Sequence, residues 1–255
     1  MRTNPIKNKL ANGEACRGVW LGLPSSFSAR LLARLPVDWL VIDAEHAPVD
    51  ALTLAQMVAA IADTGGPAPF VRVAQASVEN MKRALDAGAY GVIAPMINTR
   101  AEAEQVVAWS KFPPEGQRSF GSAYAGLAFD VSMAEYLHTA NEQVVVAIQI
   151  ENRAALDDLD EIFSVKGIDM VFVGPVDLSV SLGLEGLAEN PHPVFQKALK
   201  DILEAAHRHH LPLGIYCSNG QAAAARIAQG FQFVNITSDL NSLTKNVLAE
   251  LEASR

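Results

Sequence analysis

Eight short apolar runs, each nearly continuous in valine, isoleucine, leucine or phenylalanine, recur along the 255 residues of this chain. Such runs are typical of parallel strands that are buried on both faces, whereas a strand with one face in water alternates apolar and polar residues. The predicted strands are Gly18–Leu23, Trp39–Asp43, Pro69–Val73, Tyr90–Pro95, Val144–Ile150, Asp169–Val173, Pro212–Tyr216 and Gln232–Ile236. Parallel strands need a crossover between them, so the pattern predicts a helix in each interval.

The intervals carry residues that begin and end helices. Thr99 followed by Glu102 fits a capping box, and Ser77 fits the N-cap of a helix that runs through Leu85, with Gly88 just past its end. Further helices are predicted at Ser26–Arg34, Thr53–Asp63, Ala154–Phe163, Pro193–His209, Gly220–Gln229 and Asp239–Glu252. Strands that alternate with helices in this number predict a single (β/α)₈ TIM barrel over residues 1–255.

An open, doubly wound sheet is the competing fold. Such sheets commonly bind dinucleotides at a Gly-x-Gly-x-x-Gly turn after the first strand, and no such turn follows Gly18–Leu23. The chain also has no proline-rich or low-complexity linker that would divide it into domains. One long irregular stretch is expected at Lys111–Asp130, between the fourth and fifth strands, from where it can reach neighbouring surfaces or subunits.

Composition argues against several kinds of partner. The net charge is −8 and no block of lysine and arginine occurs, so neither nucleic acid nor an anionic membrane is the expected partner. Cys16 and Cys217 lie too far apart in sequence to suggest a redox pair or a metal knuckle, which fits a reducing cytosol. Met1–Leu10 is polar and lacks the apolar core of a signal peptide, so we expect a cytoplasmic protein.

Polar residues recur where the predicted strands end, which is where a barrel places its catalytic groups. They are Asp43, Glu45 and His46 at the second strand, Arg72 in the third, Gln149 and Glu151 at the fifth, and Asp177 after the sixth. Taken singly, each also fits a structural role, such as a helix cap, an ion pair or a buried amide. Charges are seldom buried without a partner, however, and here several converge on one rim.

This set suits one kind of chemistry. Two carboxylates, Glu151 and Asp177, can hold a hard divalent cation and leave positions for water and substrate. A 2-keto acid can fill two of those positions, and the cation then stabilises an enolate as a methyl proton leaves. Arg72 can add to the stabilisation of that oxyanion, and His46 is the natural proton-transfer group.

Other chemistries have weaker support. His207, His209 and His210 lie at a predicted helix C-terminus, where histidine complements the helix dipole. Cys217 has no base marked beside it, and no Gly-x-Ser-x-Gly elbow is present. No lysine falls at the C-terminal end of a predicted strand, so a Schiff-base aldolase would lack its nucleophile.

Six stretches together resemble one known family. They are Asp43–His46, Pro69–Arg72, Ala87–Gly91, Pro113–Arg118, Gln149–Glu151 and Gly167–Ser179. The chain is similar over most of its length, from Trp20 to about Tyr216, to the metal-dependent (class II) 2-keto-acid aldolases of the HpcH/HpaI family. That family includes 4-hydroxy-2-oxoheptanedioate aldolase and 2-dehydro-3-deoxyglucarate aldolase.

The resemblance implies a role for each matching residue. Glu151 and Asp177 would bind Mg²⁺, Mn²⁺ or Co²⁺, Arg72 and Gln149 would bind pyruvate or hydroxypyruvate, and His46 would be the base. Asp43 or Asp86 would raise the basicity of His46. The backbone around Val176 would contact the substrate carboxylate, and Trp20 and Tyr216 would wall the aldehyde side. Val176 and Tyr216 are departures, because relatives often have Ser or Ala at the first position and some have a smaller aliphatic residue at the second.

The resemblance also implies an architecture and an assembly. Family members are barrels of the phosphoenolpyruvate/pyruvate-domain type and are commonly homohexamers, trimers of dimers that exchange their last helix. The amphipathic segment Asp239–Glu252 would serve that exchange, or would pack on its own barrel.

Two rival functions use the same scaffold. An acyl-CoA lyase or thioesterase similar to citrate-lyase β chains would need a basic surface for the CoA phosphates, and no such cluster is found. A non-catalytic binding barrel would leave the rim residues without a role. The loss of one of them would have favoured this alternative, and none of the set is missing.

Overall fold

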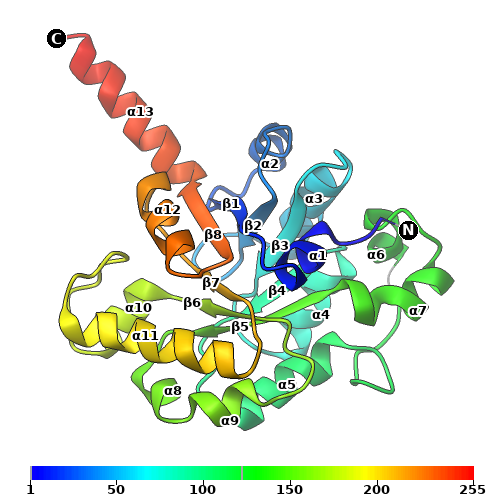
Figure 1. Cartoon of the computed structure of the whole chain (residues 1–255). Coiled ribbons are helices and arrows are strands. Elements are labelled where there is room, and N and C mark those ends of the chain that lie inside the picture. The colour runs from blue at the N-terminus through cyan, green and yellow to red at the C-terminus, as the bar shows by residue number, and fades with distance from the viewer. Residues whose placement is uncertain (1, 122) are drawn as a thin grey trace.

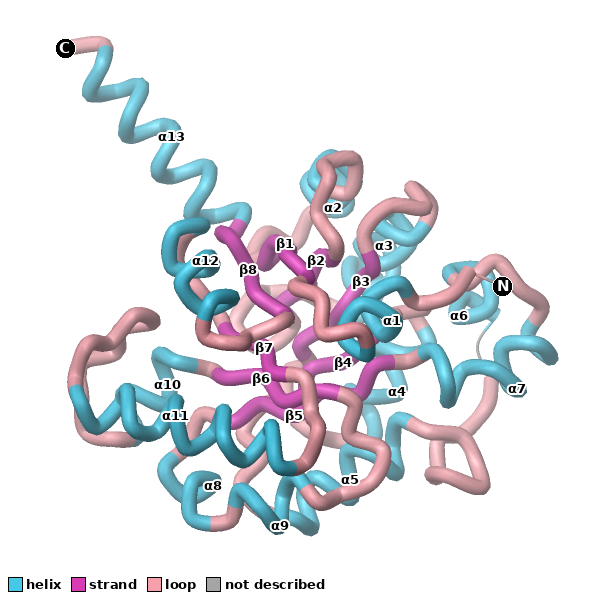
Figure 2. Tube along the Cα trace, viewed as in Figure 1, coloured by secondary structure: helices cyan, strands magenta, loops and turns pink. Residues whose placement is uncertain are grey.

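Eight parallel strands close into a barrel in which β8 pairs with β1 (Figures 1 and 2). The computed structural model describes residues 2–121 and 123–255. The strands are β1 Cys16–Leu21, β2 Trp39–Asp43, β3 Ala68–Arg72, β4 Gly91–Ala94, β5 Val145–Ile150, β6 Met170–Val173, β7 Leu213–Ile215 and β8 Phe233–Ser238. Each lies within about two residues of its predicted position. The predicted (β/α)₈ barrel is therefore confirmed.

The helices surround the strands and cover the barrel on its outer face (Figure 2). They are α1 Pro5–Ala11, α2 Ser26–Leu32, α3 Ala51–Ala62, α4 Val78–Asp86, α5 Arg100–Ser110, α6 Ala123–Ala128, α7 Met133–Gln143, α8 Arg153–Asp157, α9 Leu159–Phe163, α10 Pro175–Ser181, α11 Pro193–Arg208, α12 Gly220–Ala228 and α13 Asp239–Ala253. The capping box of Thr99 and Glu102 and the Ser77 cap both form as predicted. No helix of the described residues is long and apolar enough to cross a bilayer.

Two predictions about helices need correction. The single helix predicted at Ala154–Phe163 is divided at Asp158, whose backbone leaves the helical conformation with φ −123° and ψ 19°. The stretch predicted to be irregular at Lys111–Asp130 contains helix α6, and its residue Ser122 lies outside the described residues. Helices α1, α7 and α10 were not predicted.

Strand periodicity separates two apolar cores. Inside the barrel, Trp39 stacks on Phe233 with ring centroids 4.0 Å apart, and Phe70, Phe172 and Trp20 complete the aromatic packing. The alternate strand residues point outward against the helices, among them Leu21, Leu40, Ile42, Val71 and Ile148. A polar residue that continues an inward row must therefore point toward the barrel axis.

Four predicted site residues continue inward rows. Asp43 follows Trp39 and Val41, Arg72 follows Phe70, and Gln149 and Glu151 follow Val145 and Ala147. Their side chains therefore share the axial space at the C-terminal end of the barrel. The prediction that Gln149 and Glu151 lie on one side of their strand agrees with this row.

The opposite, N-terminal end is closed by α1. The segment around α1 contacts residues that immediately precede five strands, namely Asp38, Tyr90, Val144, Asp169 and Gln232. Ile6, on α1, is fully buried among the residues that fill the barrel. Helix α1 therefore seals the end at which a barrel carries stability rather than chemistry.

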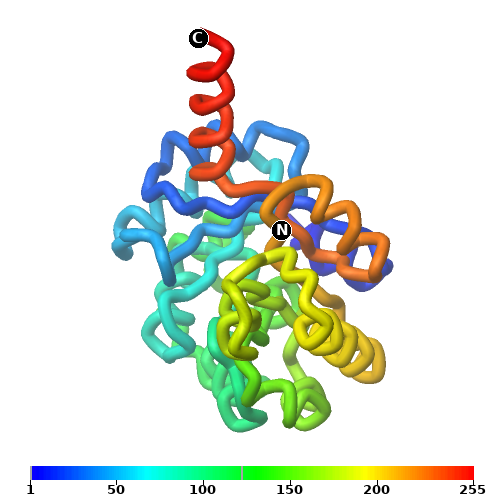
Figure 3. Tube along the Cα trace, turned by 90° about the vertical axis from the view of Figure 1, so that its left-hand side faces the viewer, coloured from blue at the N-terminus to red at the C-terminus, as the bar shows by residue number. Residues whose placement is uncertain are grey.

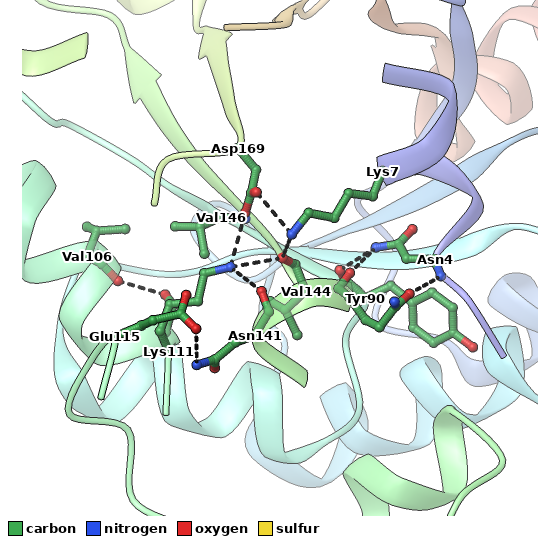
Figure 4. Close-up of polar contacts among 12 residues, drawn as sticks. Asn4, Lys7, Tyr90, Val106, Lys111, Glu115, Asn141, Val144, Val146 and Asp169 are labelled. Atoms are coloured by element: carbon green, nitrogen blue, oxygen red, sulfur yellow. Dashed lines mark hydrogen bonds and ion pairs between the residues drawn. The ribbon is translucent and has the colours of Figure 1, made fainter. Parts of the chain in front are cut away.

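A buried ion cluster strengthens this seal (Figure 4). The Nζ of Lys111 donates to the Asn141 carbonyl at 2.7 Å and lies 3.4 Å from the Asp169 carboxylate, and the Nζ of Lys7 lies 3.0 Å from the same carboxylate. Burial lowers the pKa of Lys111, and the Asp169 charge opposes that effect. Lys111 is thus a buried lysine at the wrong end of the barrel for Schiff-base chemistry, as the absence of lysines from strand C-termini predicts.

We expect Asp169→Asn to destabilise the fold by about 3 kcal/mol, because it leaves two ammonium groups without their shared counter-charge in a mostly buried position. The measurement is the free energy of unfolding in urea. Asp201→Asn, which removes an exposed pair between Asp201 and Lys197, is the control and should have little effect. If both variants lost the same free energy of unfolding, the cluster around Asp169 would contribute no more to stability than an exposed ion pair.

Candidate active site

A pocket of about 550 Å³ lies at the C-terminal ends of the strands. The predicted site residues that line it are Trp20, Asp43, His46, Arg72, Gln149, Val176, Asp177 and Tyr216. Three further lining residues, Ser238, Leu240 and Asn241, come from the junction of β8 and α13 and were not predicted. The signal for them was available, because barrel closure places the end of β8 beside Trp20 on β1.

Asp43 is the most heavily hydrogen-bonded group of the pocket. Its carboxylate accepts from Arg72 Nε at 3.0 Å and Nη2 at 2.6 Å, and from Trp20 Nε1 at 3.2 Å. It also accepts from the backbone N–H groups of Glu45 and His46. Burial alone would raise the pKa of Asp43, but these donors lower it below its ordinary value. Asp43 is therefore an ionised anchor that orients Arg72 and the turn after β2.

Arg72 is a mostly buried cation, and some of its N–H groups have no acceptor among the described residues. Burial would lower its pKa, but Asp43, Glu45 and Glu151 raise it, so the guanidinium keeps its charge. Its Nη1 lies 3.1 Å from the Glu45 carboxylate, and its Cζ lies 5.0 Å above the Trp20 ring. Of the five N–H groups of a guanidinium, about two are left for a ligand after the contacts to Asp43 and Glu45.

Glu151 is almost fully buried, with only 3% of its surface exposed. Its Oε1 accepts from the Met96 N–H at 2.8 Å, and its Oε2 accepts from Gln149 Nε2 at 2.5 Å. Burial raises the pKa of Glu151 to about 7, the two hydrogen bonds oppose the rise, and the carboxylates of Glu45 and Asp177 add to it. Among the described residues Glu151 has no ion-pair contact, and Arg72 acts on it only as a more distant charge.

The surroundings of Glu151 supply oxygen ligands, although no three His, Cys, Asp or Glu side chains of the described residues are grouped closely enough to hold a metal ion by themselves. Gly174 follows β6, and a Cβ at this position would lie 2.3 Å from Glu151 Oε2. Gln149 Oε1 is a buried oxygen atom without a hydrogen-bond donor in the described part of the chain, and Glu45 Oε2 forms an ion pair with Arg72 Nη1 at 3.1 Å. Asp177, in the first turn of α10, adds an exposed carboxylate. These are hard oxygen donors, so the residues fit Mg²⁺ or a similar divalent cation.

The imidazole of His46 is exposed at the pocket rim, and its Nε2 lies 3.9 Å from the Glu45 carboxylate. Asp43 binds the backbone N–H of His46. Asp86 accepts from Arg118 Nη2 at 2.9 Å and lines a separate groove beside α3 and α4. That either Asp43 or Asp86 raises the basicity of His46 stays a prediction. Glu45 belonged to the strand-end set, but sequence reasoning gave it no role.

Comparison with known proteins identifies the family. The family model for HpcH/HpaI aldolase/citrate lyase matches residues 17–246 of this chain. The chain belongs to the HpcH/HpaI aldolase family. It is 40% identical over 253 residues to the hydroxypyruvate/pyruvate aldolase of Rhizorhabdus wittichii, covering 98% of this chain and 99% of the relative.

Two further comparisons agree. The chain is 38% identical to the 4-hydroxy-2-oxo-heptane-1,7-dioate aldolase of Klebsiella pneumoniae, over 99% of this chain and 93% of the relative. The crystal structure of an HpcH/HpaI aldolase/citrate lyase family protein from Burkholderia cenocepacia superposes with a TM-score of 0.91 at 34% identity, covering 99% of this chain and 100% of that one. The aldolase class predicted from the motifs is confirmed, and a non-catalytic barrel loses its support.

We expect metal binding to release a proton from Glu151, because the pKa of this group is raised from its ordinary value to about 7. Below pH 7 the apparent affinity for Mn²⁺ should fall about tenfold per pH unit, and it should level off above pH 7. Calorimetric titrations at pH 6 and pH 8 measure this. Glu151→Gln or Asp177→Asn should weaken binding without unfolding the chain, and Glu204→Gln is an exposed control. Unchanged Mn²⁺ affinity in Glu151→Gln would remove Glu151 from the ligand set.

Proposed function

We propose that this protein forms the enolate of pyruvate or hydroxypyruvate and adds it reversibly to an aldehyde, which gives a 4-hydroxy-2-keto acid. The observation that carries the proposal is a pocket that holds both Asp177 and the Arg72 guanidinium, with the buried Glu151 hydrogen-bonded to the lining residue Gln149. The full-length similarity to a relative named hydroxypyruvate/pyruvate aldolase supports the choice of donor.

The donor end of the site is its buried end. Glu151 and Asp177 would hold a divalent cation, with Mg²⁺, Mn²⁺ and Co²⁺ as candidates. When bound, this cation supplies Lewis-acid stabilisation of the enolate oxygen and a template for the 2-keto-acid end. Gln149 and the backbone around Val176 would bind the donor's keto-acid end, and the remaining N–H groups of Arg72 would donate to the oxygen on which charge develops.

Arg72 and His46 would divide the work of enolisation. His46 takes a proton from the C3 methyl group of pyruvate on its ring nitrogen, directly or through a water molecule, and delivers it to the aldehyde oxygen as the new carbon–carbon bond forms; the reverse reaction runs through the same two transfers. Arg72 is oriented by the two-point contact to Asp43, so its donors are in place before charge appears on the substrate.

Large apolar surfaces wall the acceptor end. Trp20 and Tyr216 meet edge to face with centroids 5.8 Å apart, and Leu240 lies in the same pocket. Apolar walls discriminate by only about 1–3 kcal/mol per methylene group. We therefore propose that the enzyme accepts several aldehydes, and hydroxypyruvate as well as pyruvate.

Helix α13 supports a proposal about assembly. It projects away from the barrel (Figures 1 and 3), and Asp239 in its first turn is its only buried residue. The apolar side chains beyond that turn are exposed, namely Leu243, Val247, Leu248 and Leu251. We propose that two copies of the chain exchange this helix, so that each covers the apolar side chains of the other. Three such dimers would form a homohexamer. The free, buried cysteines Cys16 and Cys217 fit the cytoplasm as its location.

Light scattering after gel filtration tests the assembly. Leu248→Lys and Leu251→Lys should reduce the native mass, because each puts a charge into the proposed helix interface. Glu250→Lys, at a polar position of the same helix, is the matched control and should leave the mass unchanged. A wild-type chain that runs as a monomer would contradict the exchange.

Proton NMR of pyruvate in D₂O tests the function itself. We expect metal-dependent exchange of the methyl protons, and His46→Ala should slow this exchange by roughly 10²–10⁴-fold because it removes the proton-transfer group. Mn²⁺ affinity should be nearly unchanged in that variant, which would separate a base from a metal ligand. No exchange by the metal-loaded wild type would refute the proposed function.

A further inference from the structure

The loop of residues 182–192, which joins α10 to α11, has no part in the roles proposed above. It nevertheless connects two walls of the pocket. Helix α10 carries Val176 and Asp177 on one side, and the segment after β7 carries Tyr216 and Ser218 on the other.

The first attachment of this loop is the carboxylate of Glu189. Its Oε1 accepts from the Ser218 backbone N–H at 2.9 Å, and its Oε2 accepts from the Ser218 hydroxyl at 2.7 Å. Two charge-assisted hydrogen bonds to one residue fix orientation as well as distance. The backbone next to Ser218 is held in place by Asn235, which is buried in β8. Asn235 accepts from the Cys217 N–H at 2.6 Å and donates to the Cys217 carbonyl at 2.7 Å.

The second attachment lies inside α10. The hydroxyl of Ser179, which is fully buried, donates to the Leu187 carbonyl at 3.1 Å. Close to this attachment, the backbone of Gly186 packs on α10, since a Cβ on Gly186 would lie 3.2 Å from Val180 Cγ2 and 3.5 Å from Val176 Cγ1. The backbone of Gly186 therefore lies behind Val176 with little space between them, since one added carbon atom would already contact the Val176 side chain.

Val176 lies at the mouth of the pocket rather than at its depth. It is 38% exposed, whereas Gln149 is fully buried and Glu151 almost so. The backbone around Val176 would bind the donor, as proposed above, and its partly exposed side chain would then face the second substrate at the mouth.

We infer that loop 182–192 sets the width of the acceptor end of the pocket, and that Glu189 is a positioning residue for acceptor selectivity. The inference rests on the proposed aldol function. Glu189 ties the loop to the fixed Ser218, and Ser179 ties it to α10, so the loop holds Val176 against the pocket from behind. Loss of either attachment frees Val176 to yield to a larger aldehyde.

The test compares kcat/KM for benzaldehyde and acetaldehyde, with pyruvate as the donor and Mn²⁺ present. Glu189→Ala should raise the ratio of benzaldehyde to acetaldehyde by about threefold to tenfold, a fraction of the discrimination that one methylene group carries. Ser179→Ala should shift the ratio in the same direction, and the double variant should exceed both. Glu189→Gln should restore the wild-type ratio, because an amide can accept from the Ser218 N–H and donate to its hydroxyl.

Glu185→Ala, in the same loop, is the matched control and should leave the ratio unchanged. Methyl exchange of pyruvate in D₂O and the thermal unfolding midpoint of each variant separate selectivity from general damage, and both should stay near wild type. Exchange that persists with an unchanged ratio in Glu189→Ala and Ser179→Ala would overturn this inference and leave the proposed function intact. Absence of exchange in the wild type would instead overturn the proposed function.

Discussion

The ion pair between Asp43 and Arg72 is the interaction on which the site depends. The two residues are direct partners in the register of β2 and β3, so barrel pairing alone brings their side chains together at the same level. Both continue inward rows, which puts the pair on the barrel axis instead of among the helices. The same carboxylate also holds the Trp20 indole and the two backbone N–H groups that begin the turn to His46. One buried charge pair thus fixes Arg72, Trp20 and the turn that carries His46, the three residues for which we propose the roles of oxyanion donor, acceptor wall and base.

The two ends of the barrel differ in how completely their buried polar and charged groups are paired. At the N-terminal end, the ammonium groups of Lys7 and Lys111 surround one carboxylate, Asp169, and backbone carbonyls accept their remaining hydrogen bonds. That end is closed and satisfied, which suits a role in stability. At the C-terminal end, the buried Oε1 of Gln149 has no donor among the described residues. Unsatisfied buried groups cost free energy, and they concentrate where a ligand can satisfy them.

Sequence predicted the parts of this protein that depend on local pattern. The strand Trp39–Asp43 and the capping box at Thr99 were predicted to the residue, because burial on both faces and side-chain caps leave direct marks in sequence. Ser132 and Glu135 have the same spacing as Thr99 and Glu102, so helix α7 was also open to prediction. The division at Asp158 was not, since it depends on how two short helices pack on the barrel. The pocket residues Ser238, Leu240 and Asn241 follow from closure of the barrel rather than from any motif.

Charge balance supports the proposal that this pocket binds a keto acid together with a cation. The carboxylates of Asp43, Glu45 and Glu151 act on the Arg72 guanidinium, which Asp43 already neutralises, and the carboxylate of Asp177 acts on Glu45 and Glu151. Burial raises the pKa of both Glu45 and Glu151, and neighbouring carboxylates add to each rise. An anionic substrate would meet net repulsion in such a site. A divalent cation would reverse that sign, and it would pair with the carboxylates whose ionisation is otherwise unfavourable. The negative charge of the whole chain argues against nucleic acid or an anionic membrane as a partner. Within this pocket, the same kind of charge would attract the cation that lets an anionic substrate bind.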